Sequence, residues 1–199
     1  MSPPDLREAA LAHLARFATS EVGLKRVLER KLVRWARQAL DAGADPEKIQ
    51  QAQAASRHDL PGVVAEMARL GAVDDASFAA GRAQALSRGG RSRRAIEAHL
   101  ATRGIGSDRI AEALESTLEA GSLEDGTQAE LAAALLQARR RRIGPFGIND
   151  EDEPSETRLA MRHRALSALA RAGFSHDVAL QALDTDRETA EALIARLRG

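Results

Sequence analysis

The chain contains no cysteine and no tyrosine, and aromatic residues make up only 3% of its 199 residues. Without cysteine it has no disulfide, no zinc–thiolate site and no thiol nucleophile, which fits a reducing compartment. Scarce aromatic side chains argue against base stacking on single-stranded nucleic acid. Hydrophobic residues form 44% of the sequence, many of them alanine, so we expect a thin core of closely packed helices.

Net charge and long apolar runs are also missing. The 29 basic and 29 acidic residues give a formal net charge of zero, so attraction to nucleic acid requires a local patch. No stretch approaches the roughly 20 apolar residues of a membrane span. Residues 1–5 lack the pattern that opens a signal peptide. We therefore expect a cytoplasmic monomer that does not contact a membrane.

The sequence offers little for catalysis, metal binding or cofactor binding. Its five histidines include no pair at i, i+4, and neither an HExxH motif nor a P-loop occurs. Residues 89–92 are better explained as a turn between helices than as a phosphate cradle. The pair Asp74-Asp75 precedes an apolar-periodic helix, which indicates a helix cap. We predict no catalytic residue, no metal and no cofactor, and hence a protein that is not an enzyme.

The sequence repeats itself. A shift of 69 positions places Leu100, Gly104, Asp108, Ala113 and Leu114 on Leu169, Gly173, Asp177, Ala182 and Leu183. A fainter copy lies 72 positions upstream, where Ser20, Leu24 and Leu28 match Ser92, Ile96 and Leu100. One unit of this size cannot bury its own apolar face, so neighbouring units must stack. The repeat predicts an all-α protein of tandem three-helix repeats forming an elongated, curved array.

Apolar periodicity and cap residues divide this array into three units: 1–73, 74–122, and 123–199 with an additional C-terminal helix. In the first unit, helices are predicted over 5–18, from Ser20 to about 40, and over 60–70. The polar, Gln- and Ala-rich residues 41–58 are predicted to be an insertion, with or without a continuing helix. The remaining predicted helices begin near residues 74, 92, 107, 127, 155, 175 and 186.

The same periodicity predicts which helix faces are buried and where helices begin and end. Leu24, Leu28, Leu32 and Trp35 share one helix face, and Leu6, Ala10, Leu14 and Phe17 recur at the same spacing. Ser20 and Ser92 are predicted N-caps, and Gly104 fits a left-handed helix stop.

Positive charge gathers in two segments. Seven arginines lie between residues 82 and 109, and residues 139–142 are four consecutive arginines. Such runs are often only a solvated face. However, the helix dipole disfavours cations at a helix N-terminus, so arginines near residue 92 suggest an acidic partner, either protein or phosphate. The candidate partner-binding residues are Arg82, Arg88, Arg91, Arg93, Arg94, Arg103, Arg139, Arg140, Arg141 and Arg142.

Three stretches, in the same order, resemble the RecX family of recombination regulators. Residues 70–105 carry the family's core pattern, with Gly71, Asp74-Asp75 and Phe78-Ala79 followed by a basic helix and a glycine stop. Residues 10–32 resemble its opening, and residues 168–183 its closing Arg-Gly-Phe-Ser element. The chain departs from the family pattern at Arg82, where an aromatic residue is common, and at 41–58, which lengthens the first unit.

The resemblance implies a tandem array of three-helix units that binds along the groove of the RecA filament on single-stranded DNA. Family members generally inhibit the recombinase and ATPase activities of that filament, and some contact DNA themselves. The expected role is therefore regulation of homologous recombination and DNA repair. A long helical array suits this role because contacts to several subunits raise affinity together.

An alternative function remains open. One three-helix unit could act as a helix-turn-helix module that binds single- or double-stranded DNA without RecA, with the basic helix after Ser92 in the groove. Such a module would bind duplex DNA with steep salt dependence in the absence of the recombinase.

Overall fold

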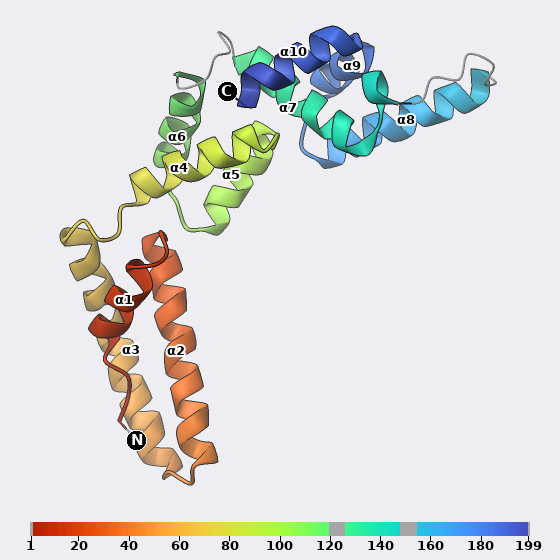
Figure 1. Cartoon of the computed structure of the whole chain (residues 1–199). Helices are drawn as coiled ribbons and strands as arrows, with labels where there is room; N and C mark the ends of the chain where they lie inside the picture. Colours follow the sequence, from red (N-terminus) through yellow and green to blue (C-terminus); the bar gives the residue numbers. More distant parts are fainter. Residues whose placement is uncertain (1, 120–125, 148–154, 199) are drawn as a thin grey trace. The chain divides into compact units, whose positions relative to one another are not determined.

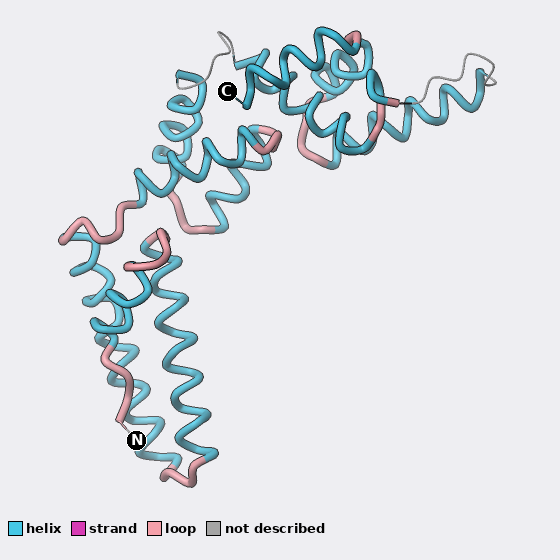
Figure 2. Tube along the Cα trace, in the orientation of Figure 1, coloured by secondary structure: helices cyan, strands magenta, loops and turns pink. Residues whose placement is uncertain are grey.

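The computed structural model describes residues 2–119, 126–147 and 155–198, and all regular structure in these ranges is helical (Figure 2). The prediction of an all-α protein is confirmed. The elements are α1 Leu6–Leu14, α2 Glu21–Asp41, α3 Pro46–Arg69, α4 Asp75–Arg88, α5 Arg93–Thr102, α6 Ser107–Glu119, α7 Gly126–Arg141, the 3₁₀ helix η1 Gly144–Phe146, α8 Ser155–Arg171, α9 His176–Asp184 and α10 Arg187–Arg198.

The chain divides into two compact units. The first comprises Met1–Phe78 with Arg103–Ile105, and the second comprises Ala79–Thr102 with Gly106–Gly199. The first unit therefore holds α1 to α3, and the second holds most of α4 and all of α5 to α10. The three predicted unit boundaries and the elongated, curved form of the array stay predictions. Within the described ranges, no helix combines the length and hydropathy needed to cross a bilayer.

The first unit is an antiparallel pair of long helices, α2 and α3, with α1 packed on both (Figure 1). Leu24, Leu28 and Leu32 recur every fourth residue, share one face of α2 and are fully buried, as the periodicity predicted. They meet Leu60 and Met67 of α3 in one cluster. Full burial of each such side chain contributes about 1.5–3 kcal/mol, so this seam holds the unit together.

The expectation of an insertion at 41–58 followed by a separate helix is wrong in its second part. Residues 46–69 form one continuous helix, and Pro61 lies inside it. Asp45 caps the start by accepting the N–H of Glu47, and Pro46 occupies the first turn, where proline is tolerated. Ile49 then packs near Trp35 of α2, so tertiary contact supports this half of the helix.

Helix α1 is also shorter than predicted. It ends at Leu14 rather than near residue 18, and the side chain of Phe17 is 55% exposed instead of buried. Leu6 and Ala10 do lie in the core, whereas Leu14 only borders it. The apolar spacing therefore extended past the point where the backbone leaves the helix.

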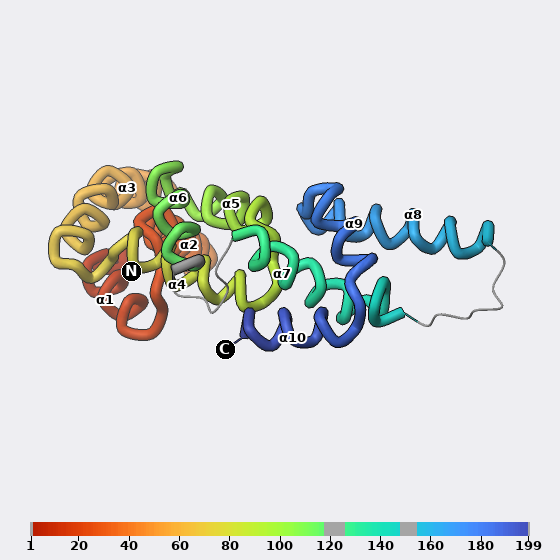
Figure 3. The backbone as a smooth tube through the Cα atoms, turned by 90° about the horizontal axis from the view of Figure 1, so that it is seen from above, coloured from red at the N-terminus to blue at the C-terminus, as the bar shows by residue number. Residues whose placement is uncertain are grey.

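The second unit is built around α7. Seven of its 16 residues are buried, and four of these are alanines, which let neighbouring helices approach closely. A helix that is apolar on most sides belongs inside a core. Both α9 and α10 pack on it, and Figure 3 shows α10 running alongside α7. Leu135 and Leu136 are fully buried in the same cluster as Leu169, Phe174 and Ile194.

Candidate functional site

The turn between α4 and α5 carries the densest group of candidate arginines. Arg88 ends α4, Arg91 precedes the Ser92 cap, and Arg93 and Arg94 begin α5. All four arginine side chains are exposed. The structure thus brings four of the ten candidate residues to one helix start.

The conformation of this turn is determined by α7. Gly90 has φ +72°, a left-handed value, and a Cβ atom there would lie within 3.1 Å of three side-chain atoms of Leu136. Gln137 Nε2 donates to the carbonyl of Gly90 at 2.8 Å, and Arg140 Nη1 donates to the carbonyl of Gly89 at 2.8 Å. Two hydrogen bonds and one tight contact therefore hold the arginine-bearing turn in place.

Ser92 caps α5 and also joins it to α8. Its Oγ accepts the N–H of Ala95 at 3.2 Å and donates to the carbonyl of Ala172 at 2.8 Å. The next residue, Gly173, has φ +94°, and a Cβ atom at this position would lie 2.5 Å from Ser92 Oγ. The buried Ser92 and the helix-ending Gly173 are therefore in direct contact, and we call this contact between the start of α5 and the end of α8 the Ser92–Gly173 joint.

The first unit contains an equivalent joint. Ser20 Oγ accepts the N–H of Gly23 at 3.0 Å and donates to the carbonyl of Arg103 at 2.6 Å. Gly104 follows with φ +79°, and a Cβ atom there would overlap the side chain of Val22. The sequence repeat therefore corresponds to a repeated contact: in each copy, a serine N-cap donates a hydrogen bond to the carbonyl of the residue before a glycine that ends a helix.

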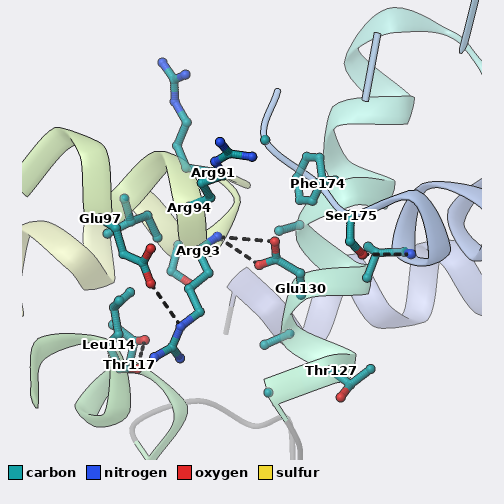
Figure 4. Close-up of a pocket in the computed structure, with 17 residues that line it drawn as sticks. Arg91, Arg93, Arg94, Glu97, Leu114, Thr117, Thr127, Glu130, Phe174 and Ser175 are labelled. Carbon is teal, nitrogen blue, oxygen red and sulfur yellow. Dashed lines mark hydrogen bonds and ion pairs between the residues drawn. The ribbon is translucent and has the colours of Figure 1, made fainter. Parts of the chain in front are cut away.

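The carboxylate of Glu130 on α7 binds the free backbone N–H at the N-terminus of α5. It accepts the backbone N–H of Arg93 at 3.0 and 3.3 Å, while Arg93 Nε pairs with Glu97 at 3.3 Å (Figure 4). A carboxylate at a helix N-terminus is favourable because of the free N–H groups there. The backbone and side chain of Arg93 thus both take part in contacts within the fold.

Burial is the largest influence on the pKa of Glu130. It raises the pKa of this carboxyl above its usual range, and the charge of Glu97 raises it further. The hydrogen bond from the N–H of Arg93 and the positive charge of that residue lower the pKa, but less. Because the folded-state pKa lies above the unfolded-state value, ionisation of Glu130 costs stability as pH rises between the two.

We expect Glu130→Gln to gain stability relative to the wild type as pH rises from about 4 to about 7, because the amide cannot ionise. The amide oxygen still accepts the N–H of Arg93. Thermal unfolding of both proteins across this range measures the difference in Tm, with the exposed Glu112→Gln as control. A difference that stays constant with pH, or that falls as pH rises, would contradict the assigned cause.

Three of the arginines of the turn, Arg91, Arg93 and Arg94, border a pocket that also has apolar lining residues. Arg91 and Arg94 line its edge, and Ile96, Leu114 and Phe174 lie among its lining residues (Figure 4). The cavity has a volume of about 650 Å³ and lies between α5, α6, α7 and the start of α9. Glu97 and Glu130 also line the pocket, so it presents cationic, acidic and apolar side chains together.

The arginines at the turn differ in what they contact. Arg93 pairs with Glu97, as described above. In the described part of the chain, the guanidinium groups of Arg88, Arg91 and Arg94 form no hydrogen bond or ion pair. These three cations remain available to a partner.

Two further candidates lie elsewhere on α4 and α5. Arg82 Nε donates to His99 Nε2 at 3.1 Å and braces α4 against α5. Arg103 has an exposed side chain just beyond α5, and its carbonyl is the acceptor of Ser20. Neither belongs to the group at the turn.

The run 139–142 lies at the end of α7, where basic residues are favourable for the helix itself. Arg140 and Arg141 donate to the carbonyls of Gly89 and Ala168, the latter at 2.6 Å. Arg139 is half-buried, and Arg142 is exposed with φ +55°. Two of the four arginines in this run therefore bond the protein's own backbone. The run is for this reason a weaker candidate for partner binding than the arginines of the α4–α5 turn.

Asp74 and Asp75 cap two different helices. Asp74 accepts the N–H groups of Ala76 and Ser77 and so caps α4, as predicted. Asp75 accepts the N–H of Glu21 at 2.8 Å and so supports the start of α2. No local pattern marked this second role, nor that of Glu130, because both depend on residues far away in sequence.

The described residues contain no group of three or more histidine, aspartate or glutamate side chains placed to hold a metal ion. The arrangement at the turn is instead one of paired caps, exposed guanidinium groups and a partly apolar pocket. Exposed guanidinium groups of this kind can bond carboxylate or phosphate oxygens.

Residues 74–114 match the family model described as the second three-helix domain of RecX. Over 186 residues the chain is 33% identical to the regulatory protein RecX of Myxococcus xanthus, covering 94% of this chain and 88% of the relative. The RecX protein of Agrobacterium fabrum is 29% identical over 124 residues, 62% of this chain and 58% of its own. That of Mycobacterium ulcerans is 36% identical over 120 residues, 60% and 61% of the two chains. The relatives are named as regulatory proteins, which agrees with the prediction that the chain is not an enzyme.

Proposed function

The chain belongs to the RecX family of regulatory proteins, and from this premise we propose that it binds the RecA filament on single-stranded DNA and inhibits its recombinase and ATPase activities. In this role it regulates homologous recombination and DNA repair, acting as a cytoplasmic monomer. The arginines of the α4–α5 turn supply the main contact with the filament.

One observation carries this assignment. Arg88, Arg91 and Arg94 are exposed on a turn that α7 holds rigidly, and two of them border a partly apolar pocket. Arginine is enriched at protein interfaces, where its planar guanidinium bonds carboxylates through two parallel N–H groups. A rigid turn lowers the entropy lost when these side chains engage a partner.

The electrostatics favour a partner over a purely structural role. Cations near a helix N-terminus oppose the dipole by about 0.3–1 kcal/mol each at exposed positions. Glu130 accepts the first free N–H of α5 and Glu97 pairs with Arg93, whereas Arg91 and Arg94 form no ion pair in the described chain. An acidic surface on the partner would offset this cost.

The location of the cluster supports the same proposal. Six of the candidate arginines lie within residues 74–114, the segment that matches the family's second three-helix domain. The zero net charge of the whole chain suits a protein partner better than naked DNA.

The proposal is tested by titrating this protein into RecA ATPase assays on single-stranded DNA. We expect ATP hydrolysis and strand exchange to fall at near-stoichiometric or lower amounts of the protein. Unchanged hydrolysis with an excess of protein that also fails to bind the filament would contradict the proposal. The helix-turn-helix alternative would then be favoured if Arg91→Ala with Arg94→Ala abolishes duplex DNA binding without RecA.

A further inference from the structure

Helix α7 ends in a backbone conformation to which arginine is poorly suited. Arg142, the residue after the helix, has φ +55°, and in the described part of the chain no other residue except glycine has a positive φ. A left-handed backbone brings Cβ close to the following carbonyl oxygen, so it costs arginine free energy that glycine does not lose. The arginine therefore occupies a position where the backbone by itself favours glycine.

Four other helix ends show which residue this position takes elsewhere. After α2, α3, α4 and α8, the N–H of a left-handed residue bonds the carbonyl three residues back, and the next N–H bonds the carbonyl five residues before it. The left-handed residues in these turns are Gly43, Gly71, Gly90 and Gly173. Arg142 and Ile143 make the same two bonds, to the carbonyls of Arg139 and Ala138. The turn after α7 is thus the same motif with arginine in place of glycine.

The side chain of Arg142 lines a pocket within the second unit, here called the Arg142 pocket. The cavity has a volume of about 700 Å³, which lies in the range of small-molecule sites. It is formed by the turn after α7, η1, α8 and the loop between α9 and α10. Its larger apolar lining residues are Ile143, Pro145, Met161 and Leu183.

Two arginines of the Arg142 pocket are available to a ligand. Arg142 and Arg158 both line the cavity and have exposed side chains. Within residues 126–147 and 155–198, neither guanidinium forms a hydrogen bond or an ion pair. Arg162, which lines the same cavity, is instead bound to Asp184 by two hydrogen bonds of 2.7 and 2.8 Å.

The remaining charged groups of the lining are held by the fold. Arg187 Nε pairs with Glu191 at 3.5 Å, and its guanidinium lies 5.8 Å from the ring centre of Phe146. Asp186 accepts the N–H of Thr189 at 2.9 Å and so caps α10. The carboxylate of Asp186 therefore has a structural role, and the cations without a partner face the cavity from the α7 turn and from α8.

Two arginines in one pocket match a phosphate group better than a carboxylate. A phosphate monoester carries close to two negative charges and three acceptor oxygens, whereas a carboxylate has one charge and two oxygens. Arginine bonds phosphate oxygens through two parallel N–H groups. The apolar lining suits a planar base better than a free sugar, whose hydroxyl groups would be buried without hydrogen bonds.

We propose that the Arg142 pocket binds a small nucleoside phosphate, with Arg142 and Arg158 on its phosphate groups and the base against the apolar lining residues. The bound anion explains why the turn after α7 carries arginine rather than glycine. This inference does not rest on the proposed function, because it involves neither RecA nor the arginines of the α4–α5 turn.

The experiment is calorimetric titration of the full chain with ADP in the absence of RecA, with adenosine and inorganic phosphate as separate probes. We expect ADP to bind at one site per chain, and each of the other two probes to bind at least about tenfold more weakly because it makes only part of the contacts. Arg158→Ala should weaken ADP binding by about tenfold or more, since it removes a charged hydrogen-bond donor. Arg164→Ala removes an exposed arginine of the same helix that does not line the cavity, and it should bind ADP like the wild type.

Arg142→Gly separates a ligand-binding role from a structural one. This variant should bind ADP about tenfold or more weakly, yet melt no lower than the wild type, because glycine adopts the left-handed turn without strain. A lower Tm with unchanged ADP binding would overturn the proposal. It is equally overturned if millimolar ADP does not bind the wild type, if Arg164→Ala loses as much affinity as Arg158→Ala, or if phosphate or adenosine binds as tightly as ADP. Displacement of ADP by a short single strand without a terminal phosphate would assign the pocket to nucleic acid and would also contradict the proposal.

Discussion

Reversing the charge of Arg91 and Arg94 is expected to weaken inhibition of the RecA filament by about tenfold or more. A hydrogen bond to a charged group contributes about 1.5–3 kcal/mol, and 1.4 kcal/mol corresponds to a factor of ten in affinity. Two reversed guanidinium contacts at one rigid turn therefore suffice for this loss. The ATPase titration with Arg91→Glu and Arg94→Glu together measures it as a shift in the inhibitory concentration.

This double variant should melt no lower than the wild type, because both side chains are exposed and form no hydrogen bond or ion pair in the described chain, and acidic residues near a helix N-terminus suit the helix dipole. Lys25→Glu with Lys31→Glu is the matched control, with the same charge change at exposed positions of α2. The difference between the two variants should shrink at high salt, where screening weakens the attraction. If the variant melts normally and inhibits like the wild type at low salt, the cluster is a solvated face and the run 139–142 becomes the favoured surface.

Replacing Ser92 with alanine is expected to lower the free energy of unfolding by about 2–4 kcal/mol. Loss of the N-cap costs about 1 kcal/mol, and the carbonyl of Ala172, left without its buried donor, costs about 1–3 kcal/mol more. Urea unfolding of the full chain measures the change. Ser167→Ala is the control, since this half-buried helical serine makes no hydrogen bond in the described chain.

The joint also predicts that two substitutions are coupled. Gly173→Ala should destabilise the wild type strongly, because of its φ of +94° and the close approach to Ser92 Oγ. It should cost less when Ser92 is already alanine, since only the backbone strain then remains. A loss below about 1 kcal/mol for Ser92→Ala, or strictly additive effects, would contradict the joint.

Much of this fold follows from local sequence signals. The caps Ser20, Ser92 and Asp74 and the stop at Gly104 lie where the pattern predicted them, since each depends on residues within one turn. The 69- and 72-residue repeats identified the serines and glycines as equivalent positions. They did not reveal that Ser92 bonds the carbonyl preceding Gly173, because the partners are 80 residues apart.

Where the predictions were wrong, tertiary contact overrode the local pattern. The polar residues 41–58 were predicted to be an insertion before a helix over 60–70, yet α3 runs from Pro46 to Arg69 because its capped start and Ile49 hold the first half against α2. Phe17 matched the apolar spacing of α1 but lies beyond its last turn. Periodicity shows which residues share a face, but not where a helix ends.

The candidate site also combines features that the local sequence predicts with features that depend on distant residues. The arginines of the turn were visible as a charge cluster beside a predicted cap. Arg93 pairs with Glu97 four residues later on the same helix, whereas the bond from its N–H to Glu130 joins residues 37 positions apart and could not be predicted from the local sequence.

The most direct test of the central claim uses the absence of cysteine, which makes an introduced thiol unique. Arg91→Cys carrying a photoreactive crosslinker would be bound to RecA filaments on single-stranded DNA and irradiated, with Lys31→Cys as the control position. We expect a covalent adduct between position 91 and RecA, and little or none from position 31. An adduct from position 91 to DNA alone, or equal adducts to RecA from both positions, would contradict the claim that the α4–α5 turn contacts the filament protein.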